Sequence, residues 1–231
     1  MKDWNYSDTT DWHGMKNQVI TVIIENGITS IGSAAFYGCS NLTSIEIPNG
    51  VTSIEAAAFY ECSSLTSMKI PSSVTTIGSS AFYGCEQLII ICKSETAAET
   101  YAKEKGITYQ IDDQIPNINI TQNGTETKVK SATSTVLVTD ELAGVDKNNL
   151  KYLWSEENDG ITKENITNKF ENGETLEIKD ETGIYYLWIY ARDNVGNEII
   201  QKSNAFYIDN TPPTANVTYS LSRNNTTKYP I

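Results

Sequence analysis

A 23-residue block occurs three times in succession, and this period limits the fold more than any other feature of the sequence. The blocks begin at Ile28, Val51 and Val74, with the sequences ITSIGSAAFYGCSNLTSIEIPNG, VTSIEAAAFYECSSLTSMKIPSS and VTTIGSSAFYGCEQLIIICKSET. A unit of this size cannot bury its apolar residues alone, so consecutive units must stack. The repeat therefore predicts a solenoid, in which binding occurs on a surface more often than in a cleft.

Apolar residues recur at the same places in each block and indicate the core of the coils. The β-branched VTSI and LTSIEI stretches are typical of strands, whereas AAFYGC suits a turn that returns the chain. A half repeat precedes the first block, because Val22 and Ile24 align with Ile45 and Ile47. The predicted core columns are Ile28/Val51/Val74, Ile31/Ile54/Ile77, Ala35/Ala58/Ala81, Phe36/Phe59/Phe82, Leu42/Leu65/Leu88 and Ile45/Met68/Ile91.

Both ends of the solenoid require a cover. Residues 96–106 predict a capping helix: Thr96 and Glu99 form a capping box, and Gly106 suits the left-handed position after the last turn. Ala98, Tyr101 and Ala102 would form its apolar face. At the other end, in residues 1–18, the aromatic side chains of Trp4, Tyr6 and Trp12 are expected to plug the first coil rather than to form a ligand platform.

The pattern L-x-x-I-x-I-P-x-x-V-T-x-I-x-x-x-A-F-x-x-C resembles the BspA-type leucine-rich repeat, a family of bacterial and protozoan surface proteins. The resemblance covers residues 19–111. It implies a right-handed solenoid with the L-x-x-I-x-I strands in a parallel sheet on one face. It also implies a general association with adhesion, although this fold does not fix the ligand.

The second half, residues 112–210, predicts an all-β sandwich. The segment ETGIYYLWIYARDNVGN, from Glu181 to Asn197, resembles the late hairpin of bacterial immunoglobulin-like domains. In that resemblance Tyr185 takes the tyrosine-corner position, Leu187 stands where antibody domains carry a cysteine, and Trp154 matches the core tryptophan. The expected strands are 117–121, 135–139, 150–155, 175–179, 184–192 and 199–208.

Charge and the two ends of the sequence bear on the location of the protein. The net charge is -12, and each half carries an acidic excess, which argues against binding to nucleic acid or to anionic lipid. No membrane span or secretory signal is evident in the sequence, so the chain is either cytosolic or a piece of a longer exported protein. Residues 209–231 resemble 112–128, so 211–231 predict the start of a further, truncated module or a tail. We therefore expect an internal fragment of an extracellular or cell-surface protein.

The four cysteines suggest neither zinc nor a disulfide framework. Cys39, Cys62 and Cys85 occur once per repeat, which predicts an internal ladder of free thiols. Cys92 is expected either to be exposed or to pair with Cys85.

Two groups of residues offer oxygen ligands for calcium: Asp193, Asn194 and Asn197 in one hairpin, and the junction residues Asp112, Asp113 and Asp209. A hairpin turn explains the DNVGN segment more simply, and no ligand-dense loop accompanies the junction residues. No metal and no cofactor are therefore predicted.

No set of residues with catalytic spacing is present, and the protein is predicted not to be an enzyme. Two surfaces remain for binding. The outward positions of the strand face are Thr43/Thr66/Ile89, Ser44/Ser67/Ile90 and Glu46/Lys69/Cys92, which predict a flat surface without a deep pocket. On the turns, Tyr37, Tyr60 and Tyr83 form a stripe that either binds a partner or only packs on the next coil.

Three functions fit these surfaces. The first is a monomeric, non-enzymatic surface segment whose repeat domain binds a host or matrix protein or glycan. The second is an architectural spacer that displays an activity located elsewhere in a longer chain. The third is an accessory module of a carbohydrate-active enzyme.

Overall fold

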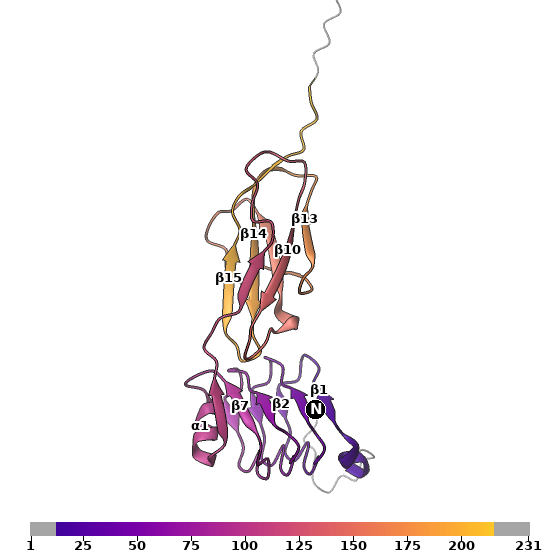
Figure 1. The fold of residues 1–231 in the computed structure, drawn as a ribbon, viewed down its shortest axis with the longest axis vertical. Helices are drawn as coiled ribbons and strands as arrows, with labels where there is room; N and C mark the ends of the chain where they lie inside the picture. Colours follow the sequence, from indigo (N-terminus) through magenta and orange to yellow (C-terminus); the bar gives the residue numbers. More distant parts are fainter. Residues whose placement is uncertain (1–12, 215–231) are drawn as a thin grey trace, which may run out of the picture.

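The computed structural model describes residues 13–214, which form two bodies in succession along the chain (Figure 1). The first is a solenoid of parallel strands, as the repeat predicts. The second consists of antiparallel sheets around a common apolar core. The predicted plug of Trp4, Tyr6 and Trp12, and most of the 211–231 segment, lie outside the described residues.

Two rows of short parallel strands build the solenoid. The half repeat occupies the predicted register, since Val22 of the first strand pairs with Ile45. A 3-10 helix, η1 (His13–Gln18), precedes the coils. The strands of the broad face are β1 (Thr21–Ile23), β3 (Ser44–Glu46), β5 (Ser67–Lys69), β7 (Ile89–Cys92) and β8 (Thr108–Ile111), and those of the second face are β2 (Ser30–Ile31), β4 (Ser53–Ile54) and β6 (Thr76–Ile77).

The core of the solenoid is a set of ladders that run from coil to coil. Phe36, Phe59 and Phe82 stack with ring centroids 5.2 and 5.3 Å apart. Beside them, the thiol of Cys62 donates to the Phe36 carbonyl and that of Cys85 to the Phe59 carbonyl, each at 3.1 Å. The free-thiol ladder is therefore confirmed.

The third repeat departs from the regular period by one position. In the β5–β7 pairing, Ser67 lies opposite Ile89 and Met68 opposite Ile90, whereas the period would place them opposite Ile90 and Ile91. Because side chains alternate along a strand, a shift of one residue exchanges the two faces. Ile90 and Cys92 are therefore completely buried in the core, and the predicted column Ile45/Met68/Ile91 is wrong at its last member. Cys92 is neither exposed nor paired, contrary to both expectations.

The predicted capping helix is confirmed as α1 (Ala97–Lys105). The Thr96 hydroxyl accepts from the Glu99 amide, and Gly106 has the left-handed φ of 68°. The Glu99 carboxylate accepts from the amide of Glu95 rather than from that of Thr96, so the capping box is displaced by one residue. The buried face of the helix consists of Ala98, Tyr101 and Ala102, and the Tyr101 ring meets Phe82 edge-on at 5.8 Å.

The second body has two sheets, in the strand orders β13-β10-β9 and β12-β11-β14-β15. The predicted single strand 199–208 is instead two strands along β14, because the register changes by one residue between Lys202↔Trp188 and Phe206↔Tyr185. This is a β-bulge, at which the Ser203 hydroxyl accepts from the Leu187 amide. The elements are β9 (Asn117–Ile120), β10 (Ala132–Thr139), η2 (Lys147–Asn149), β11 (Lys151–Ser155), β12 (Asn168–Lys169), β13 (Thr175–Ile178), β14 (Thr182–Arg192), β15 (Glu198–Lys202) and β16 (Phe206–Asp209).

Loops of the sandwich rest on the turns that follow the broad-face strands (Figure 1). Ile91, turned outward by the register shift, packs with Ala143 and Val195 of the sandwich in a small buried cluster. The Ser72 amide donates to the Val195 carbonyl at 3.0 Å, and the Asn49 side chain donates to Asp146 at 2.6 Å. The extra apolar residue of the third repeat thus provides the apolar part of the contact between the two bodies.

Candidate functional site

The strand face is walled on one side by the sandwich and forms a groove of about 410 Å³. Five of the six strand-face residues proposed from the sequence line it: Thr43, Ser44, Glu46, Ser67 and Lys69. Thr66 is exposed but does not line the groove. The expected flat surface without a pocket is therefore wrong, because the sandwich supplies a wall that the repeat alone does not have. Ile90 and Cys92 are not on this face, since the register shift turns them inward.

Residues of the sandwich complete this junction groove, and the sequence did not indicate that they would line it. Gly144, Val145, Lys147 and Asn194 form its second wall. The Lys69 ammonium approaches Gly144 so closely that a Cβ at this glycine would lie 3.2 Å from the Lys69 Nζ. Asn194 belongs to the DNVGN hairpin, but the sequence offered it as a calcium ligand and not as part of the strand face. Gly144, Val145 and Lys147 belong to no repeat or motif, so no signal in the sequence joins them to that face.

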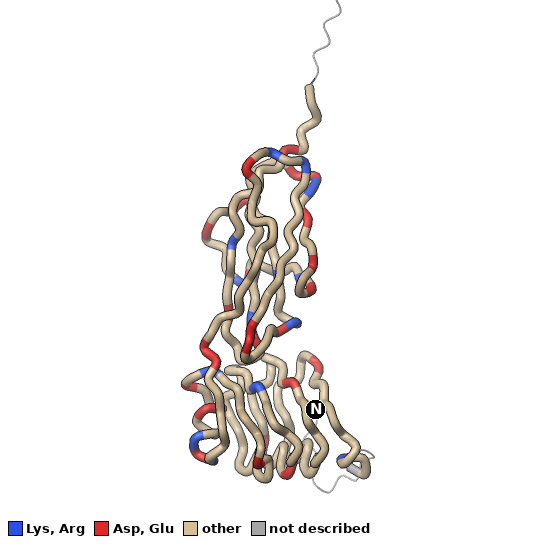
Figure 2. Tube along the Cα trace, viewed as in Figure 1, with Lys and Arg blue, Asp and Glu red and all other residues tan. Residues whose placement is uncertain are grey.

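The groove holds charged groups without ion-pair partners. Within residues 13–214, Glu46, Lys69 and Lys147 each lack an oppositely charged side chain within 4.0 Å, whereas ion pairs elsewhere join residues such as Lys163 and Glu198. Figure 2 shows acidic and basic positions distributed over both bodies, with acidic positions where the bodies meet. Hydroxyls and unpaired charges of both signs suit a polar partner.

The tyrosines on the turns form a continuous stack. Ring centroids of Tyr37 and Tyr60, and of Tyr60 and Tyr83, lie 4.8 Å apart. The Lys16 ammonium lies 5.8 Å from the Tyr37 centroid. Burial, followed by the neighbouring Tyr83 hydroxyl, raises the pKa of Tyr60. Most of the stripe is thus occupied in packing against itself, whereas Tyr83, the last ring, remains 61% exposed.

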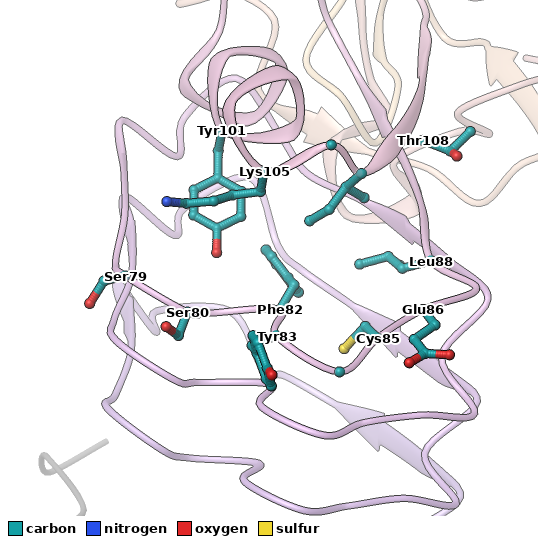
Figure 3. Close-up of a pocket in the computed structure, with 13 residues that line it drawn as sticks. Ser79, Ser80, Phe82, Tyr83, Cys85, Glu86, Leu88, Tyr101, Lys105 and Thr108 are labelled. Carbon is teal, nitrogen blue, oxygen red and sulfur yellow. The ribbon is translucent and has the colours of Figure 1, made fainter.

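A second cavity, of about 430 Å³, lies between the third coil and the end of α1 (Figure 3). The exposed ring of Tyr83, the Tyr101 ring, Lys105 and Glu86 line it. It shares no lining residue with the junction groove. The capping helix therefore covers the phenylalanine column but leaves the tyrosine column open.

Three carboxylates from distant parts of the sequence gather beneath the junction. Oxygens of Asp112, Asp140 and Asp193 lie within 4.8 Å of one another. Asp193 is fully buried, and its Oδ1 accepts from the amides of Val195, Gly196 and Asn197. Burial raises the pKa of Asp193, and hydrogen bonds from Asn197 offset part of the rise. These contacts form the hairpin loop expected for the DNVGN segment.

The other residues that the sequence offered for calcium make hydrogen bonds or ion pairs with groups of the protein. Asp113 accepts from the amide and hydroxyl of Ser94, both at 3.0 Å. Asn197 donates to the Asp112 carbonyl and to Asp193. Asp209 lies at the far end of the sandwich with Lys128. The structure therefore does not bring Asp112, Asp113 and Asp209 together. Asp140, which does lie beside Asp112, was not one of the residues that the sequence offered for calcium.

The thiols have the properties of core residues rather than of nucleophiles. Burial raises the pKa of Cys85 and of Cys92 to about 11. A nucleophilic cysteine requires a lowered pKa and partial exposure. The thiol ladder therefore contributes packing and hydrogen bonds to the solenoid core.

Within residues 13–214, no helix has both the length and the apolar character required to cross a membrane.

Comparison with known proteins identifies the repeat. The family described as "BspA type Leucine rich repeat region" matches residues 15–130, half of the 231-residue chain, in six copies. A leucine-rich cell-surface protein from Faecalibacterium prausnitzii is 39% identical over 30% of this chain and 18% of its own, with a TM-score of 0.28. The T. pallidum leucine-rich repeat protein is 28% identical over 33% of this chain and 49% of its own, with a TM-score of 0.29. The chain thus spans less than half of either structure, and no curated protein matches it.

Proposed function

The chain belongs to the BspA-type leucine-rich repeat family, and on this premise we propose that it is a non-enzymatic segment of an extracellular or cell-surface protein. Its solenoid binds a host or matrix protein or glycan at the junction groove. Proteins of this repeat family are surface proteins with a general role in protein binding and adhesion, which supports both parts of the proposal.

The observation that carries this proposal is the pairing of strand-face residues with loops of the sandwich around one groove. Lys69 of the solenoid and Lys147 of the sandwich both line it, together with the Glu46 carboxylate. Unpaired charges cost little in water but gain hydrogen-bonded partners when a complementary surface docks. A groove of about 410 Å³ is also within the range of sites that hold a side chain or a sugar unit.

The test is binding of the 231-residue chain to a panel of purified matrix proteins and to a glycan array. For any partner found, Lys69→Glu should weaken binding by about tenfold or more, because it reverses a charge inside the groove. Lys93→Glu is the matched control, since Lys93 also belongs to the solenoid but does not line the groove. Equal loss in both variants, or none in Lys69→Glu, would remove the groove from the proposal.

The connection between the two bodies supports a second function, that of a rigid spacer. Ile91, Ala143 and Val195 bury one another across the junction, and hydrogen bonds from Ser72 and Asn49 flank them. Such contacts restrict relative motion of the bodies. Absence of binding across the whole panel, with an adhesive or catalytic module elsewhere in the full-length protein, would favour this function.

We also infer that the sandwich is immunoglobulin-like. Trp154 pairs with Leu187 between β11 and β14, and its ring meets Phe206 edge-on at 5.0 Å in the core. Tyr185, in the tyrosine-corner position, donates to the Glu181 carboxylate at 3.1 Å rather than to the backbone. An experimental structure with a different strand order in either sheet would contradict the assignment.

A further inference from the structure

We propose that the open edge of the third coil binds a short extended peptide carrying an aromatic side chain, in the part of a fourth coil's place that α1 leaves open. This edge is the cavity between the third coil and α1 (Figure 3). The inference rests on the proposed function in one respect, that the solenoid binds protein, but it names a different site from the junction groove.

Each turn of the solenoid donates three backbone hydrogen bonds to the turn of the next coil. In the first coil, the amides of Ala34, Phe36 and Gly38 donate to carbonyls of the second coil at 2.7–3.0 Å. In the second coil, the equivalent amides donate at 2.7–3.0 Å to the carbonyls of Ser79, Ala81 and Tyr83. The donors and the acceptors both fall on alternate residues, as in the pairing of parallel strands. The turns of the second and third coils therefore each accept three backbone hydrogen bonds from the turn of the preceding coil.

In the part of the chain that the structure describes, no further coil follows the third coil at this edge. Its equivalent amides belong to Ser80, Phe82 and Gly84, and within residues 13–214 those of Ser80 and Gly84 have no acceptor. The capping helix reaches only the middle of the edge. Burial raises the pKa of the Tyr101 hydroxyl, and hydrogen bonding from the Phe82 and Ala81 backbone offsets part of this rise. One amide donor thus remains on each side of the position that α1 covers.

The tyrosine stack ends at the same edge. Tyr60 has a ring on each side, at 4.8 Å, whereas Tyr83 stacks on Tyr60 alone and is 61% exposed within the described part of the chain. An aromatic side chain placed one more step along the stack would continue its spacing. Offset stacking of this kind adds to the area that binding buries.

The shape and polarity of the cavity select the peptide class. Its volume of about 430 Å³ accommodates one aromatic side chain and adjacent peptide units. The donors that line it, the two amides and the Lys105 ammonium, favour carbonyl and carboxylate oxygens. The free amides of Ser80 and Gly84 lie on either side of Phe82, at alternate positions of the turn. This spacing matches the carbonyls of an extended peptide better than the hydroxyls of a sugar ring. The interface between successive coils of this solenoid supplies the geometry of the expected complex.

The probe is a fluorescently labelled, end-blocked peptide with the sequence SSAAYG, which is that of residues 79–84 of this chain with alanine in place of the phenylalanine, because Tyr101 already covers the Phe82 ring. We expect it to bind the 231-residue protein in a fluorescence-polarisation titration. Alanine in place of the peptide's tyrosine should weaken binding by about threefold to tenfold, which is the affinity that one aromatic pair contributes. Tyr83→Ala in the protein should have an effect of the same size. Tyr207→Ala is the matched control, because Tyr207 is an exposed tyrosine of the sandwich.

Amide hydrogen exchange followed by NMR tests the backbone contacts directly. At a peptide concentration of about ten times Kd, exchange at Ser80 and Gly84 should slow by about tenfold, because only the free fraction exchanges. Failure of the peptide to bind, or binding without protection of these two amides, would overturn the proposal. A glycan that binds in a Tyr83-dependent manner while the peptide does not would also overturn it.

The two proposals fail separately in this design. Lys69→Glu lies in the junction groove and should leave peptide affinity unchanged within about twofold, because the two cavities share no lining residue. Matrix or glycan binding that depends on Lys69, without peptide binding, would leave the proposed function intact and remove only this inference. A peptide affinity that falls with Lys69→Glu would contradict the assignment of the peptide to the coil edge.

Discussion

Replacement of Ile91 by aspartate should release the sandwich from the solenoid without unfolding either body. Ile91 is 8% exposed and belongs to a cluster whose other members, Ala143 and Val195, are sandwich residues. Loss of a buried isoleucine side chain removes about 2–3 kcal/mol. This corresponds to a roughly 30- to 150-fold shift toward the undocked state, since each 1.4 kcal/mol is about tenfold.

Electrostatics should increase this shift. The Ala143 amide donates to the Asp112 carboxylate and the Val195 amide to that of Asp193. A new carboxylate at position 91 would therefore lie near two existing ones, and like charges in a partly buried site repel one another strongly.

The assay is pulsed electron paramagnetic resonance between spin labels at Thr75→Cys in the solenoid and Thr162→Cys in the sandwich, both exposed positions. The original protein should give a narrow distance distribution and Ile91→Asp a broad one. Ile89→Asp is the matched control, because Ile89 precedes Ile91 on the same face of β7 but is not in the junction cluster. A narrow distribution for Ile91→Asp, or equal broadening for Ile89→Asp, would refute the reasoning.

Three further predictions concern stability and reactivity. Glu61→Gly should raise Tm by about 2 °C, because Glu61 has a φ of 57° at a position where the other coils have glycine. Gly84→Ala should lower Tm, because Gly84 has a φ of 79°. Calorimetry measures the sign of each change. In the folded protein the thiols should resist a thiol-specific reagent at about pH 8, because burial raises the pKa of Cys85 and Cys92 to about 11. In denaturant all four should react. Rapid reaction of the folded protein would contradict this expectation. Hydrogen bonding from a threonine hydroxyl and a lysine ammonium lowers the pKa of Asp209 to about 2, so its contribution to stability should be present above about pH 4 and decline toward pH 2. Urea midpoints of the original protein and Asp209→Asn should therefore converge as the pH falls, and a constant gap would disprove the link.

The parts of the fold that sequence predicted well are those determined by local chemistry or by repetition. The half repeat, the thiol ladder and the capping helix all follow from side-chain types at particular positions, and the structure places them accordingly. The prediction for the register of β7 was wrong because Ile89, Ile90 and Ile91 are interchangeable by pattern alone. The strand expected at 199–208 was also wrong, since no residue type there marks the bulge that the Ser203 contact creates.

The sequence by itself determined that the chain forms a stacked solenoid with a phenylalanine and cysteine core, because its period repeats the same burial requirement in every coil. Only the tertiary structure decided where a partner can bind. The junction groove requires loops far along the chain from the strand face, such as the one at Lys147, and the open coil edge exists because α1 covers one aromatic column and not its neighbour. Both features depend on packing between segments distant in sequence, which no local pattern encodes.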